Sequence, residues 1–433
     1  MQTSVQEPSD DKAFLKNERI RFGLGTILYQ SEEAGLGGIP TVIIRALGGD
    51  DRHIGLLGTF SSFGFLASVL ANNFLRWKNS NRGAMVFSML IGFVISSLTC
   101  LSLLLSYGET FRPFALYVFV ALSVLLGGVN GLQANIECNW IGDLVHEKVR
   151  GWFTKIKWIL SICGILVFTN VLGKFTDMFP VYGGYAAVYA LFAVSFFAAA
   201  FFIYPRIPDR VPKTANFFSA GTASNERLNY KDKIYWLYQT HGVLWMSGRQ
   251  IFNAFTAAYL IEQYHFTMAK LAYLLSIQSI MSIAVLYVIG DRTDKWGSRK
   301  PFIFVLIGSA SIMSLWIMSA KWGIVCIFIA YFLGGLAGHT LSMLGNNFAL
   351  EVLPAKGRSA YMALARLIIA PVSIFAVASA GWLLHRFVDF HVTFSGFVLS
   401  RYHLLFFVSM LICFVGIIPL LIIGKRKVGV LNV

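Results

Sequence analysis

The sequence is poor in charge and in cysteine. Only 13% of its 433 residues are Asp, Glu, Lys or Arg, whereas soluble domains carry about 25%. This shortage excludes an ordinary soluble enzyme and a disordered chain. The five cysteines, Cys100, Cys138, Cys163, Cys326 and Cys413, show no metal-ligand spacing and do not indicate a disulfide framework. No nucleophile–base spacing or phosphate-binding glycine loop occurs either, so the sequence predicts a protein that is not an enzyme and needs no cofactor.

Long apolar runs dominate what is present. Apolar residues make up 56% of the chain, and a membrane-spanning helix needs about 20 of them in succession. Some runs qualify without any charge, and others qualify if one or two polar breaks are tolerated. The runs cover residues 22–46, 53–75, 83–108, 113–136, 152–173, 178–205, 234–261, 271–290, 301–320, 322–350, 359–385 and 402–424. We therefore predict an all-α membrane protein with twelve transmembrane helices.

The basic residues fall unevenly between these runs. If the chain starts inside, 26 of its 36 Lys and Arg residues lie on the side of both termini, counting Lys155 and Lys157 at the inner end of the run 152–173. Eight lie outside, counting Arg45, and Arg249 and Arg366 lie within runs. Cytoplasmic loops are enriched in Lys and Arg, so this bias predicts cytoplasmic termini in a cell (inner) membrane. The bias also accounts for the net charge of +15 without a nucleic-acid partner.

A proline- and serine-containing segment interrupts the pattern halfway along the chain. Residues 205–233 contain Pro205, Pro208 and Pro212 together with scattered basic residues, which is typical of a linker. The predicted organisation is a cytoplasmic tail (1–21), a six-helix half (22–204), a cytoplasmic linker (205–233), a second six-helix half (234–424) and a second tail (425–433).

The two halves echo each other at their cytoplasmic loops. Asp143 and Arg150 follow the fourth run, and Glu351 and Arg358 follow the tenth, at an offset of 208 residues. Parallel six-helix repeats are a known transporter architecture. These acid–arginine pairs are candidates for ion pairs that lock the cytoplasmic side shut. The alternative is that they are solvated loop charges that enforce topology.

The loop after the eighth run carries glycine, aspartate and basic residues at a fixed spacing. Gly290, Asp294, Gly297, Arg299 and Lys300 match the pattern G-x-x-x-D-x-x-G-x-[RK]-[RK]. This pattern resembles the loop motif of the major facilitator superfamily, and the acid–arginine pairs resemble its second cytoplasmic signature. The resemblance implies two pseudo-symmetric six-helix bundles and alternating-access secondary transport. The loop over residues 72–82 lacks the motif's aspartate, and no subfamily is assigned.

Charged residues inside the predicted spans are the candidates for transport chemistry, because charge is costly in the bilayer. Glu32 lies ten residues into the first run, about 15 Å from the inner surface at 1.5 Å per residue. Glu33 is adjacent, and Tyr29 shares its helical face. Either carboxyl is a candidate proton carrier. A structural pair with Arg249 or Arg45 is the alternative.

Further polar residues at a similar depth come from both halves. Asn130, Gln133 and Glu137 form one stripe along the fourth run. The second half adds Arg249, Asn253, Gln278, His339 and Arg366. A solute site between two repeats is expected near the midplane, but interhelical polar packing is the competing explanation for these residues.

The sequence thus predicts a monomeric secondary transporter for a small polar or charged solute. The driving force would be a proton or sodium gradient, with proton symport the leading interpretation. The alternatives are a lipid or amphiphile flippase, a drug exporter, or a membrane sensor that transports nothing. Substrate, transport direction and coupling ion stay open.

Overall fold

The computed structural model describes residues 12–35, 38–145, 147–179, 181–209, 231–290, 299–353, 358–394 and 396–423. Within these ranges the chain is helical except for one β-hairpin. Nine helices in the described part are long and apolar enough to cross a membrane. The predicted all-helical membrane architecture is therefore confirmed.

Most helix boundaries lie within a few residues of the apolar runs, but the predicted run 22–46 is divided between the helices Lys12–Gly35 and Ile39–Ala46, and the run 53–75 between Asp51–Gly58 and Phe60–Lys78. The N-terminal helices are α1 (Lys12–Gly35), α2 (Ile39–Ala46), α3 (Asp51–Gly58), α4 (Phe60–Lys78), α5 (Asn81–Leu105), η1 (Glu109–Phe111), α6 (Arg112–Leu144), α7 (Glu147–Met178), α8 (Val181–Ala198), η2 (Ala199–Ile203) and η3 (Tyr204–Arg206). The C-terminal elements are α10 (Lys233–Tyr264), α11 (Met268–Gly290), α13 (Arg299–Trp322), α14 (Ile324–Val352), α15 (Arg358–Arg386), β1 (His391–Phe394), β2 (Phe397–Ser400) and α16 (Arg401–Ile422).

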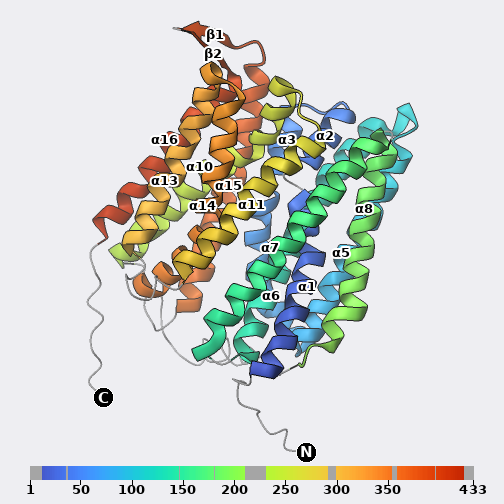
Figure 1. Cartoon of the computed structure of the whole chain (residues 1–433), viewed down its shortest axis with the longest axis vertical. Coiled ribbons are helices and arrows are strands. Elements are labelled where there is room, and N and C mark those ends of the chain that lie inside the picture. The colour runs from blue at the N-terminus through green and yellow to red at the C-terminus, as the bar shows by residue number, and fades with distance from the viewer. Residues whose placement is uncertain are drawn as a thin grey trace, which may run out of the picture. The chain divides into compact units, whose positions relative to one another are not determined.

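The chain forms two compact units. The first contains the N-terminal helices together with Ala257–Ser279, which is the end of α10 and the beginning of α11. The second contains the rest of α10 and α11 and the helices that follow. In the first unit, α1 packs on α7, and α5 packs on α8 (Figure 1). Helix α4 packs on α6. In the second unit, α13 packs between α14 and α16.

Glycines bring α4 and α6 into backbone contact. A Cβ atom on Gly131 would lie 2.0 Å from the carbonyl oxygen of Gly64, and one on Gly64 would lie 2.7 Å from that of Gly127. Helices in membranes gain most of their association energy from such close packing, because no water is released between them. These glycines therefore set the spacing of the two helices.

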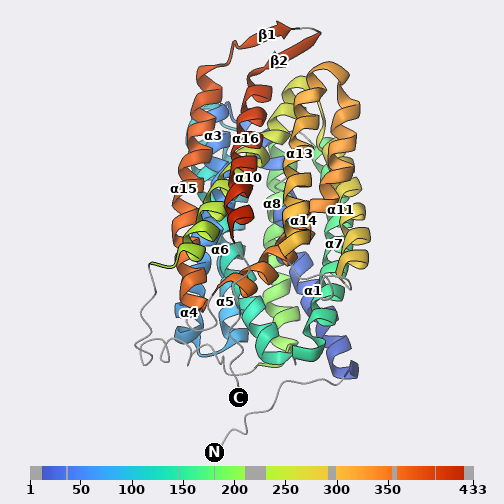
Figure 2. The same ribbon diagram turned by 90° about the vertical axis from the view of Figure 1, so that its left-hand side faces the viewer.

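A β-hairpin joins α15 to α16, and the sequence analysis did not predict it. β1 and β2 pair antiparallel from His391 opposite Ser400 to Phe394 opposite Phe397. Gly396 has a φ of 83°, which is the left-handed conformation that glycine adopts without strain. The hairpin projects beyond the ends of α15 and α16 (Figure 2).

Asp50 caps α3 and carries a testable pH dependence. Its carboxylate accepts a hydrogen bond from Arg52 Nε, and the Nδ1 atom of the His53 ring lies 2.8 Å from it. Burial tends to raise the pKa of Asp50, but these two partners outweigh it and hold the pKa well below the ordinary value. A depressed pKa adds stability above the unfolded-state pKa of about 4, and this stability is lost as the pH falls through the lower folded-state value.

We expect the Asp50→Asn variant to lose about 1 kcal/mol of unfolding free energy at pH 7, because asparagine keeps the cap but not the charge. Thermal unfolding of the purified protein from pH 7 to pH 3 measures this difference. The gap between variant and wild type should persist to about pH 4 and narrow only below it. A gap that closes between pH 7 and pH 5 contradicts the assignment.

Candidate functional site

A buried ion pair lies inside the N-terminal unit. Lys157 Nζ on α7 lies 3.0 Å from Glu137 Oε2 on α6, and each side chain is only 4% exposed. An unpaired charge at such a position is strongly unfavourable, so each group offsets the cost of burying the other. The pair is therefore a buried electrostatic contact between α6 and α7.

Helix α1 supplies hydroxyl groups to the same carboxylate. Tyr29 donates its hydroxyl proton to Glu137 Oε2 at 2.9 Å. The Thr26 hydroxyl lies 2.7 Å from Glu137 Oε1, and its single proton is also within reach of the Phe22 carbonyl at 2.7 Å. Three helices, α1, α6 and α7, thus meet at one carboxyl group. We call Thr26, Tyr29, Glu137 and Lys157 the buried polar cluster.

Packing around the cluster keeps it tightly enclosed. The chain leaves α8 through the π-helical turn η2, which places Tyr204 in the core. A Cβ atom on Gly25 of α1 would lie 2.6 Å from the Tyr204 hydroxyl, so the glycine makes room for the ring. One turn from Glu137, Gln133 is fully buried and its amide lies 3.6 Å from the sulfur of Met89.

The predicted polar stripe on α6 is buried throughout, because Asn130, Gln133 and Glu137 all face the interior. Tyr29 is buried as well. Glu32 and Glu33 belong to α1, but their side chains lie outside the described residues.

The candidates of the second half do not form a comparable cluster within the described residues. Arg249 is half-buried on α10 and interacts electrostatically with Cys413 of α16. Arg366 is half-buried on α15 and interacts with Tyr238. Asn253 is exposed and Gln278 is half-buried. The side chain of His339 lies outside the described residues.

Two of the motif residues, Asp143 and Arg299, form hydrogen bonds that tie helix ends together. Asp143 accepts a hydrogen bond from Asn81 Nδ2 at 3.1 Å, which ties the end of α6 to the start of α5. Arg299 donates to the carbonyl groups of Leu420 and Leu421 at the end of α16, at 3.2 and 3.3 Å. Lys300 and Glu351 are exposed. The remaining candidates lie outside the described residues, either entirely (Asp294, Gly297) or in their side chains (Arg150, Arg358).

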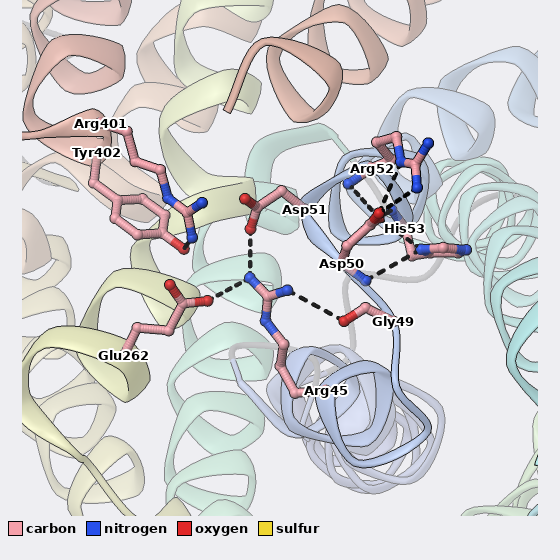
Figure 3. Close-up of polar contacts among 9 residues, drawn as sticks. All are labelled: Arg45, Gly49, Asp50, Asp51, Arg52, His53, Glu262, Arg401 and Tyr402. Carbon is pink, nitrogen blue, oxygen red and sulfur yellow. Dashed lines mark hydrogen bonds and ion pairs between the residues drawn. The ribbon is translucent and has the colours of Figure 1, made fainter. Parts of the chain in front are cut away.

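A second polar cluster involves Arg45. Figure 3 shows its guanidinium between Asp51 and Glu262, with bonds from Nη2 to both carboxylates and from Nη1 to the Gly49 carbonyl at 3.2 Å. Asp51 is 2% exposed, so it depends on this counter-charge. Since Glu262 lies on α10, Arg45 fastens the end of that helix to α2 and α3. We call these three residues the Arg45 bridge.

We expect Arg45→Gln to lower the free energy of unfolding by about 1–3 kcal/mol, because it leaves the buried Asp51 carboxylate without its cation. Arg52→Gln is the matched control, since Arg52 is about half exposed in its pair with Asp50 and exposed ion pairs contribute little to stability. Thermal unfolding of the two purified variants tests whether Arg45→Gln loses more stability than Arg52→Gln does. Equal losses in both would show that Asp51 does not depend on Arg45.

Sequence reasoning missed the partners in both clusters. In the sequence, Lys157 is a charged residue inside the run over residues 152–173, and no local pattern singles out Asp51 or Glu262. Periodicity identifies residues on one helix face, but it does not reveal which other helix lies opposite. The sequence offers one cue to such a partner, namely a charged residue inside an apolar run. Lys157 shows this cue, and its side chain is buried.

Comparisons with known proteins agree with this architecture. The family model described as Major Facilitator Superfamily matches residues 22–318 and 242–430. The chain therefore belongs to the major facilitator superfamily of transporters, and it is a transporter rather than an enzyme. No match was found among curated proteins.

Solved transporters share the fold at low sequence identity. A D-xylose–proton symporter aligns with a TM-score of 0.69 at 14% identity, over 96% of this chain and 99% of its own. A POT family transporter in complex with a thioalcohol-conjugated peptide gives 0.65 at 15%, over 94% and 95%. The nucleoside transporter NupG gives 0.61 at 15%, over 96% and 100%. Similarity at this level establishes the fold alone.

Proposed function

We propose that this transporter is a proton-coupled symporter of a small polar or charged solute, and that Glu137 and Lys157 couple the proton to transport. The observation that carries the proposal is the 3.0 Å ion pair buried between α6 and α7. Buried ionisable residues in membrane helices are expensive and usually mark ion or substrate pathways.

The Glu137–Lys157 pair has the chemistry to couple proton binding to solute binding. A proton that binds the Glu137 carboxylate removes its negative charge and leaves the Lys157 ammonium buried without a counter-ion. The helices of this unit then have to rearrange, or the Lys157 ammonium has to bind a polar or anionic group of the solute. Protonation of Glu137 and binding of the solute therefore favour the same conformational change. A ligand shifts a conformational equilibrium only through such a difference in interaction between the two states.

Helix α1 extends the polar cluster toward the predicted carriers. Thr26, Tyr29 and Glu33 are spaced by three and four residues, so they lie along one face of the helix. We propose Glu33 as the next proton-accepting group along this face. Glu32, Arg249, Asn253, Gln278, His339 and Arg366 remain proposed solute-contacting residues. Both termini are proposed to be cytoplasmic, and the protein is proposed to act as a monomer in the inner membrane.

The solved relatives support a polar solute by analogy. Their descriptions name D-xylose with protons, nucleosides and a conjugated peptide. These are small molecules rich in hydrogen-bonding groups, as expected for a site lined by a carboxylate, an ammonium and hydroxyls.

Uptake into proteoliposomes under an imposed pH gradient tests the proposal. Solutes are first chosen by thermal stabilisation, since a ligand that binds the folded state raises the unfolding temperature. Proton-coupled symport predicts accumulation that a protonophore abolishes and that a sodium gradient does not replace. Accumulation that requires sodium, or no accumulation of any stabilising solute, contradicts proton symport.

A further inference from the structure

A groove lies on the first unit where α4 turns into α5. It has a volume of about 400 Å³, and its walls include Lys78, Arg82, Val86, Phe87, Leu90 and Pro205. Two membrane-spanning segments, Asn81–Leu105 and Tyr182–Arg206, have their ends at this groove. The groove therefore sits at the level where a span meets the membrane surface.

The groove is cationic at its mouth. Lys78 Nζ lies over the rings of Trp77 and Phe87, 4.1 and 4.4 Å from their centres. Arg82 donates to the Pro205 carbonyl at 3.4 Å, which leaves its charge exposed. In the described part of the chain, neither Lys78 nor Arg82 forms an ion pair with a carboxylate.

Among the described residues, a carboxylate near the mouth already has hydrogen-bond partners. Asp209 accepts hydrogen bonds from the Ser80 hydroxyl and, at 3.2 Å, from the Arg82 backbone N–H. It thus caps the first turn of α5, where the helix dipole favours a negative charge. The side chains of Lys78 and Arg82 are left to bind a different anion.

The wall below the mouth is apolar and only partly buried, and its residues Val86 and Leu90 also pack against the core of the unit. Val86 and Leu90 are one helical turn apart and half-buried, with Phe87 beside them. Leu90 is nine residues from the start of α5, so the apolar strip reaches about 13 Å along the helix. Trp77 is 63% exposed next to the mouth, as aromatic residues commonly are at a membrane interface.

We infer that this groove binds an anionic phospholipid. Its phosphate lies between Lys78 and Arg82, and one acyl chain lies along Val86, Phe87 and Leu90. Basic pockets between transmembrane helices on the cytoplasmic side recognise acidic head groups, and the positive-inside bias places this turn on that side. Charge and shape therefore agree on one occupant, a glycerophospholipid with net negative charge.

Native mass spectrometry of the purified full chain tests this inference. The probes are dioleoyl-phosphatidylglycerol, dioleoyl-phosphatidylcholine and glycerol 3-phosphate. We expect retention of phosphatidylglycerol over phosphatidylcholine and no adduct with glycerol 3-phosphate. The Lys78→Gln/Arg82→Gln double variant should bind phosphatidylglycerol about thirtyfold more weakly, since each basic residue contributes roughly fivefold.

Two further variants make the test specific. Lys231→Gln/Lys233→Gln removes the same charge from exposed positions at the start of α10 and should leave binding unchanged. Val86→Trp fills the apolar wall, keeps both cations and should reduce binding. Equal losses in the two charge variants, equal binding of both phospholipids, or binding of glycerol 3-phosphate as strong as that of the lipid would overturn the inference.

Discussion

Replacing Glu137 with glutamine is expected to lower the free energy of unfolding by about 3–5 kcal/mol. Glutamine still accepts the hydroxyl protons of Thr26 and Tyr29, so the loss comes from Lys157, whose charge stays buried without a counter-ion. Lys157→Met should lower the free energy of unfolding by a similar amount, because it leaves the buried Glu137 carboxylate without its cation. Thermal or denaturant unfolding of the purified variants measures both effects.

The double variant Glu137→Gln/Lys157→Met separates the charges from the packing. It removes both charges while it keeps side chains of similar size, and such replacements are often neutral for stability. We expect it to recover most of the stability that each single variant loses. If the double variant is as unstable as the sum of the two single variants, the ion pair is not the dominant interaction at this site.

Gly131→Ala is the second substitution with a large expected effect. The new Cβ atom would lie 2.0 Å from the Gly64 carbonyl oxygen, so α4 has to move away from α6. Overpacking of this kind costs about 1–3 kcal/mol and sometimes more. Since a backbone group cannot rotate aside as a side chain does, we expect at least 3 kcal/mol, read from the unfolding midpoint.

Gly308→Ala is the matched control for this experiment. Gly308 is also inside a helix, α13, and a Cβ atom there would meet nothing within 4 Å. Alanine is the better helix former, so this variant should be as stable as the wild type or slightly more stable. A Gly131→Ala protein that unfolds at the same temperature as the Gly308→Ala protein would rule out close backbone contact between α4 and α6.

The helices could be predicted from the sequence because their signal is local. Each apolar run is long enough to span a membrane, and most helices extend only a few residues beyond the run. Helix α1 begins ten residues before its run, and helix α6 continues eight residues past its run, from residue 136 to Leu144 through Glu137 and Asp143. These acids are tolerated because Lys157 and Asn81 pair with them, and hydropathy alone does not contain that information.

The site could be predicted only in part, for the same reason. The stripe of Asn130, Gln133 and Glu137 is a property of one helix, and it identified one side of the buried polar cluster. The bond from Tyr29 to Glu137 joins residues 108 positions apart, and the Arg45 bridge to Glu262 spans 217. Such partners depend on which helices are neighbours, and this follows from packing rather than from local periodicity.

The central claim is that the Glu137–Lys157 pair couples protons to solute movement. It is tested most directly by measuring accumulation under a pH gradient and solute counterflow without a gradient, side by side in proteoliposomes. The wild type should show both activities. The Glu137→Gln variant, which mimics the protonated carboxyl and keeps Lys157, should keep counterflow but lose gradient-driven accumulation, because it still binds solute and has no proton to carry at this position. If that variant accumulates solute as well as the wild type does, the pair is structural and the coupling group lies elsewhere.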